Sequence, residues 1–147
     1  MKKIILAAIV LAVFSGAAFA GGGLNGFLHD LNIQAHADLN SYTARLSTQF
    51  GVPEVRVRAD IGMVREPADA FMCLQLGQWT QNPPEQVVHV YKANQGKGWG
   101  VIAKSLGIKP GSAEFHALKN GELTFTGNPE QVQGHGKGKG KGKEHNK

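Results

Sequence analysis

The sequence contains only one cysteine, Cys73, among its 147 residues. A single thiol excludes an intramolecular disulfide framework, a four-cysteine zinc site and an all-cysteine iron–sulfur cluster. Charged residues are also scarce, at 18% of the chain against about a quarter in an average protein. Hydrophobic residues still make up 41%, which argues against wholesale disorder and, with no succession of long apolar runs, against a polytopic membrane protein. The length allows one domain of ordinary size.

Motifs typical of catalysis are missing as well. The sequence has no HExxH, CxxC or GxSxG pattern and no paired-carboxylate signature. Cys73 stands in an apolar helical run, whereas a nucleophilic cysteine needs an exposed and polarised thiolate. We therefore predict that the protein is not an enzyme and binds no cofactor.

Residues 1–20 have the pattern of a secretory signal peptide. Two lysines precede a short uncharged apolar run, and a small-x-small sequence ends it at residues 18–20. The run is short for a membrane span, which needs about 20 apolar residues. We expect cleavage near Ala20/Gly21 and export from a bacterial cell to the periplasm or beyond.

The formal net charge of +5 is unevenly divided along the chain. Residues 21–133 carry nine basic and ten acidic side chains, a net charge of −1. Residues 134–147, called the tail below, carry five lysines and one glutamate, a net charge of +4. The basic character therefore belongs to the leader and the tail, and the domain between them is nearly neutral.

The tail alternates glycine with lysine and has no apolar side chain to bury, so we expect it to be disordered. Such a polycation suits an anionic envelope component as its partner: lipid headgroups, an acidic polymer or extracellular nucleic acid. The alternative is a solubilising end that binds nothing in particular. The candidate polyanion-binding residues are Lys137, Lys139, Lys141, Lys143 and Lys147.

Between the leader and the tail, apolar residues recur mainly at helical spacing. We expect a loose lead-in over residues 21–29 and one helix over residues 30–50, ending before Gly51 and Pro53. Residues 54–64 alternate apolar and charged side chains, a strand-like pattern. Because no strand partner is evident, we favour an irregular or short helical piece there.

Clearer signals follow. Pro67 and Pro84 each suit the first turn of a helix, a short helix follows the glycine-rich turn at 96–100, and Ser112 suits the N-cap of a last helix ending at residues 120–121. We predict an all-α fold, a small orthogonal bundle of four to five short helices. The domain covers residues 21–133, with its core at about 27–125.

The last two of these helices have the pattern of a helix-turn-helix, in which a small residue lets the helices approach and a glycine forms the turn. Such a unit can read the DNA major groove, but the export signal, the nearly neutral domain and a second helix without arginines favour a scaffold role. The residues of this pattern are Trp99, Ala103, Leu106, Gly107, Phe115 and Leu118.

Histidines offer a different hypothesis. Glu85 and His89 are four residues apart, and His29 and His36 lie near or on an earlier helix. Histidine and carboxylate at this spacing suit a divalent metal, although solvated side chains are the simpler interpretation.

Residues 96–119, GKGWGVIAKSLGIKPGSAEFHALK, resemble a segment of a group of small exported bacterial proteins of unknown function. That group shares GWG-x-IAK-x-LGI after a helix like residues 84–94, and its members often end in glycine- and lysine-rich tails. The likeness runs from about Pro67 to Lys119, with Asp69 and Tyr91 in matching places. It implies an exported, mostly helical domain and names no substrate, cofactor or catalytic residue.

Together these features predict an exported, non-enzymatic binding or envelope-associated protein whose tail attaches it to an anionic surface or polymer. One alternative is a periplasmic metal-binding protein that uses the histidines and Glu85. The other is nucleic-acid binding through the helix-turn-helix-like segment.

Overall fold

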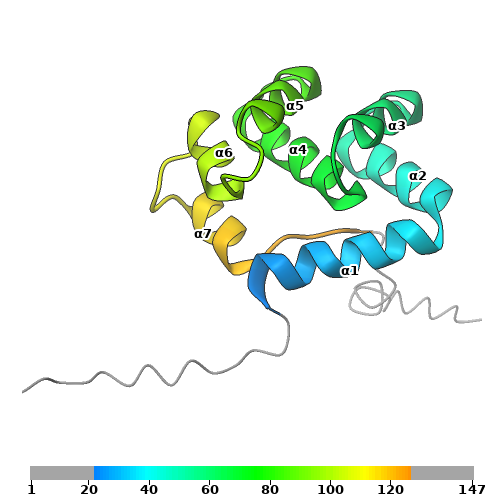
Figure 1. Ribbon diagram of the computed structural model, residues 1–147, viewed down its shortest axis with the longest axis horizontal. Helices are drawn as coiled ribbons and strands as arrows, with labels where there is room; N and C mark the ends of the chain where they lie inside the picture. The colour runs from blue at the N-terminus through cyan, green and yellow to red at the C-terminus, as the bar shows by residue number, and fades with distance from the viewer. Residues whose placement is uncertain (1–21, 127–147) are drawn as a thin grey trace, which may run out of the picture.

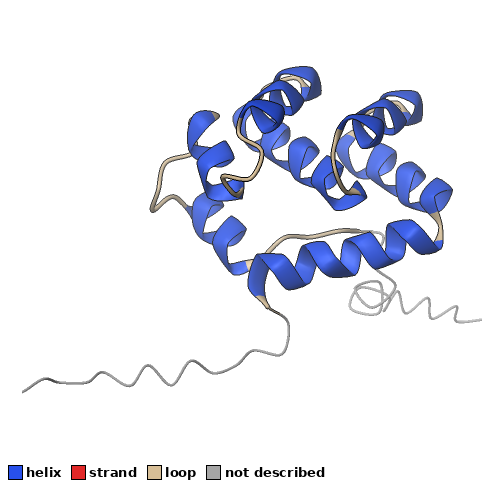
Figure 2. Ribbon diagram, in the orientation of Figure 1, coloured by secondary structure: helices blue, strands red, loops and turns tan. Residues whose placement is uncertain are grey.

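Seven α-helices follow one another in the computed structural model, which describes residues 22–126 (Figure 1). They are α1 (Gly23–Ala37), α2 (Leu39–Phe50), α3 (Glu54–Met63), α4 (Pro67–Thr80), α5 (Pro84–Ala93), α6 (Trp99–Ser105) and α7 (Ala113–Asn120). No strand is present over this range (Figure 2). The predicted all-α class is confirmed for residues 22–126, which form seven helices, not four to five.

Helix α4 is the centre of the packing. Every residue from Ala70 to Gly77 is buried, so this helix is enclosed on all sides rather than on one stripe. It contacts α1, α2, α3 and α5, and its Phe71 ring packs edge-on against Phe50 of α2. Helices α6 and α7 pack against each other beside α5 and α1.

The first helical segment differs from the prediction in two ways. The expected lead-in at 21–29 is helical from Gly23, because Leu24, Phe27 and Leu28 place an apolar stripe against the core. The expected single helix over 30–50 is broken at Asp38, whose carboxylate accepts a hydrogen bond from the Ser41 N–H at 2.9 Å. Asp38 is thus the N-cap of α2 and lets the chain turn between two packed helices.

The ambiguous segment 54–64 is a helix, α3, so the short helical interpretation is right and the strand-like alternation is misleading. Val57 faces the core, whereas Val55 is 77% exposed. The other helix boundaries agree closely with the prediction: Pro67 and Pro84 occupy first turns, and the Ser112 hydroxyl accepts a hydrogen bond from the Phe115 N–H.

After α7 the chain runs extended alongside α1 (Figure 1). Phe125 is buried there, with its ring centroid 5.4 Å from that of Tyr42 and 6.1 Å from that of Phe71. The Gln49 side chain of α2 donates to the Thr124 carbonyl and accepts from the Thr126 N–H. These contacts attach the C-terminal end of the described chain to the core. None of the helices described is both long and apolar enough to cross a membrane.

Candidate functional site

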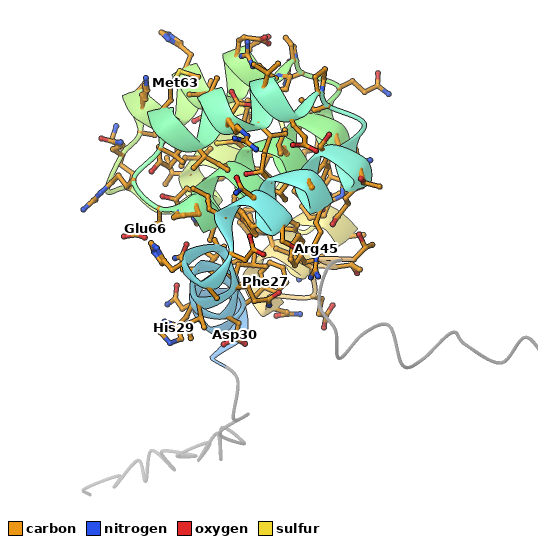
Figure 3. The ribbon with its side chains drawn as sticks, turned by 90° about the vertical axis from the view of Figure 1, so that its right-hand side faces the viewer. Phe27, His29, Asp30, Arg45, Met63 and Glu66 are labelled. Carbon is orange, nitrogen blue, oxygen red and sulfur yellow. The ribbon has the colours of Figure 1, made fainter. Side chains whose placement is uncertain are left out.

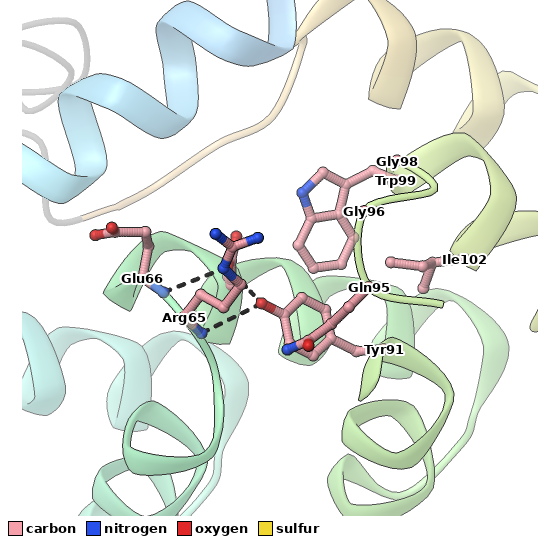
Figure 4. A pocket seen from close by; sticks show the side chains of 9 residues that line it. Arg65, Glu66, Tyr91, Gln95, Gly96, Gly98, Trp99 and Ile102 are labelled. Carbon is pink, nitrogen blue, oxygen red and sulfur yellow. Dashed lines mark hydrogen bonds between the residues drawn. The ribbon is translucent and has the colours of Figure 1, made fainter. Parts of the chain in front are cut away.

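A cavity of about 360 Å³ lies between the α3–α4 corner and the start of α6 (Figure 4). Arg65 and Glu66 come from the corner, and Asp69 from the first turn of α4. Tyr91 comes from the last turn of α5, and Gln95 and Trp99 from the loop and helix that follow.

Local helix-capping chemistry positions the acidic side chains. Pro67 opens α4, Glu66 is its N-cap, and Asp69 is its third residue. The Glu66 N–H donates to Asp69 Oδ2 at 3.3 Å, and the Glu66 side chain accepts from the Asp69 N–H in return. This reciprocal capping box orients the Asp69 carboxylate at the helix N-terminus, where a negative charge is favourable.

Tyr91 connects the capping box to the rest of the pocket. Its hydroxyl donates to Asp69 Oδ2 at 2.7 Å and accepts from the Arg65 N–H at 3.2 Å. Its ring stacks on Trp99, with centroids 5.4 Å apart and an interplanar angle of 25°. In Figure 4 the Arg65 guanidinium and the Trp99 indole stand on opposite sides of the cavity, with the Tyr91 ring below them.

The electrostatics of the pocket follow from this partial enclosure. Burial raises the pKa of Asp69, and the hydrogen bond from Tyr91 opposes that shift. Burial and the hydrogen bond to Asp69 raise the pKa of Tyr91 to about 12, so its phenol is a protonated donor at neutral pH. Asp69 Oδ1 and the Arg65 guanidinium make no hydrogen bond with any residue in the range 22–126. The pocket therefore presents the free Asp69 oxygen, the Arg65 guanidinium and an aromatic wall, beside the Glu66 carboxylate and the Gln95 amide that also line it.

The residues of the helix-turn-helix-like pattern lie mainly where α6 meets α7. Ala103 and Leu118 are buried, and Gly107 has φ +95° in the turn. The Phe115 ring lies over Gly100, within 3.7 Å of where a Cβ atom there would stand. Leu106 is partly buried against the core. Trp99, assigned to the same pattern, instead stacks on Tyr91 of α5 and lines the pocket.

The four candidate metal ligands do not come together. His29 and His36 are exposed on α1, where Figure 3 shows His29 on the outer surface, and His36 Nε2 lies 3.6 Å from Glu66 Oε2. Glu85 and His89 are on α5, which lies across α4 from α1 (Figure 1), and Glu85 forms an ion pair with Arg56. In the part of the chain that the structure describes, no three His, Cys, Asp or Glu side chains are grouped to hold a metal.

Two predictions lie outside the described residues. One is the set of candidate polyanion-binding lysines in the tail, and the other is the signal peptide with its cleavage position. Conversely, sequence reasoning did not select Arg65, Glu66, Asp69, Tyr91 or Gln95 as site residues. The only pointer was the resemblance, which includes Asp69, Tyr91 and the GWG sequence that contains Trp99. No family model matches the chain, and no curated protein or solved structure is significantly similar to it, so no relative assigns these side chains a role.

Proposed function

We propose that this protein is an exported, non-enzymatic binding protein. Its helical domain holds a small ligand in the pocket at Tyr91 and Trp99, and its tail attaches it to an anionic component of the cell envelope. The observation that carries the proposal is the division of charge: −1 over residues 21–133 and +4 over the tail. A polycation joined to a nearly neutral domain suits attachment, since near an anionic membrane each lysine contributes about 1 kcal/mol.

The distribution of lysines within the helical domain supports an anionic partner too. All five lysines of the described residues lie on α5, α6, α7 and their connecting loops, the left side of Figure 1. All five are exposed, and none forms an ion pair with another residue of the described range. They are Lys92, Lys97, Lys104, Lys109 and Lys119.

The chemistry of the pocket favours binding over catalysis. The Tyr91 phenol, with a pKa of about 12, does not supply a base at neutral pH. Asp69 Oδ2 is engaged by Tyr91 and by the Glu66 N–H. The thiol of Cys73 is buried in α4 and its pKa is raised by burial, which makes it a poor nucleophile.

Two variants of equal charge test the role of the tail. In the first, the five tail lysines are replaced by glutamine; in the second, the five lysines of the helical domain are. With vesicles of phosphatidylglycerol and phosphatidylcholine in low salt, we expect the first variant to bind roughly a hundredfold more weakly than the second. Binding by the unaltered chain should fall steeply as salt rises. Equal losses in the two variants would contradict attachment through the tail.

One observation favours a second candidate function, nucleic-acid binding through the α6–α7 pair. These helices contact each other across a glycine turn, and three exposed lysines lie on them or on the loop between them: Lys104, Lys109 and Lys119. A helix-turn-helix with nearby cationic side chains suits a phosphate backbone. The test is a gel shift of duplex DNA at low salt with the variant whose tail lysines are glutamine. A gel shift that is lost when the five domain lysines are also replaced supports this candidate. Absence of any gel shift rules it out.

A further inference from the structure

We propose that the pocket binds a neutral saccharide, with one sugar ring against Trp99 and its hydroxyl groups on Asp69 and Arg65. This inference rests on the proposed binding function and names the class of ligand. Four features of the pocket carry it: the aromatic wall, the unpartnered acceptor, the unpartnered donor and the size of the cavity.

The aromatic wall is held rigidly for a ligand. Tyr91 covers one side of the Trp99 indole by stacking at 5.4 Å, and the indole also lines the cavity. The faces of an aromatic ring carry partial negative charge, which attracts the weakly positive C–H groups on the flat side of a sugar ring. Because the phenol of Tyr91 is fixed by Asp69 and by the Arg65 N–H, the stacked pair is already in place before a ligand arrives.

The polar groups of the pocket suit a ligand with several hydroxyl groups better than a ligand with one charged group. Asp69 Oδ1 is an acceptor and the Arg65 guanidinium a donor, and neither has a hydrogen-bonding partner among residues 22–126. Burial raises the pKa of Asp69, and the nearby charge of Arg65 offsets a small part of that rise, so the two groups are close to each other. A hydroxyl both donates and accepts, so neighbouring hydroxyls of one sugar satisfy both groups at once. The Gln95 amide, which also lines the cavity, adds a donor and an acceptor for further hydroxyls, and the carboxylates of Asp69 and Glu66 outnumber the one guanidinium, which disfavours an anionic ligand.

The volume of about 360 Å³ is at the small end of the range for ligand pockets, about 300–1,000 Å³. A cavity of this size accommodates one or two sugar rings.

The neutral saccharide is not attracted by the lysines of the tail, so its binding can be measured in the full chain without interference from them.

The experiment uses the full-length Trp79→Phe variant, in which Trp99 is the only remaining tryptophan. Chitobiose, cellobiose and maltose are titrated in turn while Trp99 fluorescence is recorded, with alanyl-alanine as a zwitterionic comparison. We expect a saturable change with at least one disaccharide. Adding Arg65→Gln should weaken that binding tenfold or more, because the donor on one side of the cavity is lost. The matched control Arg58→Gln removes an exposed arginine of α3 that pairs with Glu54 instead, and should leave binding unchanged.

Calorimetry on the unaltered chain provides a second measurement that needs no substitution. Absence of saturation by all three disaccharides in both measurements overturns the saccharide proposal. Equal effects of Arg65→Gln and Arg58→Gln also overturn it, because binding would then lie elsewhere. If only alanyl-alanine binds, the ligand is not a saccharide, but the pocket remains a binding site. Failure of vesicle attachment with saccharide binding intact counts against the tail and not against the pocket.

Discussion

Asp60, on α3, is a buried carboxylate with incomplete hydrogen bonding. Its Oδ1 accepts from Arg56 Nε at 3.2 Å, while Oδ2 is buried without a hydrogen-bonding partner among the described residues. Arg56 is shared, since it also pairs with Glu85. Burial raises the pKa of Asp60 more than the attraction of Arg56 lowers it. Folding therefore disfavours the ionised form of Asp60 relative to the protonated form.

This shift predicts how stability depends on pH. A raised pKa in the folded state means that the folded protein binds the proton more tightly than the unfolded chain does. The contribution of Asp60 is thus fully present below its unfolded pKa of about 3.9 and is lost as pH rises through the folded value. We expect Asp60→Asn to flatten the fall in the free energy of unfolding above pH 4, as measured by urea unfolding from pH 4 to pH 7.

A residual fall should remain in this variant, because burial raises the pKa of Asp69 in the same direction. Asp38→Asn is the matched control: Asp38 is exposed, and asparagine is also a good N-cap. If Asp60→Asn and the unaltered protein show the same dependence on pH, the assignment to Asp60 is wrong.

At the scale of helices, two glycines with nearly the same backbone conformation have different surroundings. Gly51 ends α2 with φ +64°, and Gly121 ends α7 with φ +70°. A Cβ atom at Gly51 would meet nothing within 4 Å. At Gly121 it would stand 2.5 Å from the Gly23 carbonyl at the start of α1. Gly121 thus has a tertiary role, the close approach of α7 and α1, besides its role as a C-cap.

Alanine at each position separates the two effects. Gly51→Ala should cost about 1 kcal/mol, because only the left-handed backbone conformation is penalised. Gly121→Ala should cost about 1–3 kcal/mol more, because the backbone of Gly23 must move. Urea unfolding of both variants at the same pH measures the difference. Equal losses would show that α7 and α1 are not packed this closely.

At the scale of the whole molecule, Cys73 reports on the integrity of the core. It lies in α4 and is 1% exposed, and burial is the main cause of its raised pKa, with Asp69 and Asp60 adding to the shift. We expect the native chain to react with a thiol reagent such as DTNB only as fast as the core opens. In urea the reaction should be complete and rapid.

An introduced cysteine provides the comparison for this measurement. Ser105→Cys places a second thiol at an exposed position on α6, which should react in the native protein at the rate of a free thiol. Native-state labelling of Cys73 at that same rate would show that α4 is not the enclosed centre of the molecule.

The sequence by itself determined the all-α class and most helix ends. Pro67, Pro84, Ser112 and the asparagine–glycine pair at 120–121 act on the backbone of the next few residues, so their effect is readable locally. The break at Asp38 was also encoded locally, by an N-cap residue that the helical periodicity on either side obscured. The alternation of apolar and charged side chains in α3 was misleading, because so short a segment fits both the period of a strand and the period of a helix.

Only the tertiary structure determined that the pocket forms and that the proposed metal ligands lie apart. The hydrogen bond between Asp69 and Tyr91 and the stacking of Trp99 depend on how α4, α5 and α6 pack, which no local spacing specifies. The same packing placed His29 and His89 on helices that α4 separates. Capping acts over one helical turn, whereas a binding site needs side chains from distant segments, and only burial of the shared core brings those segments together.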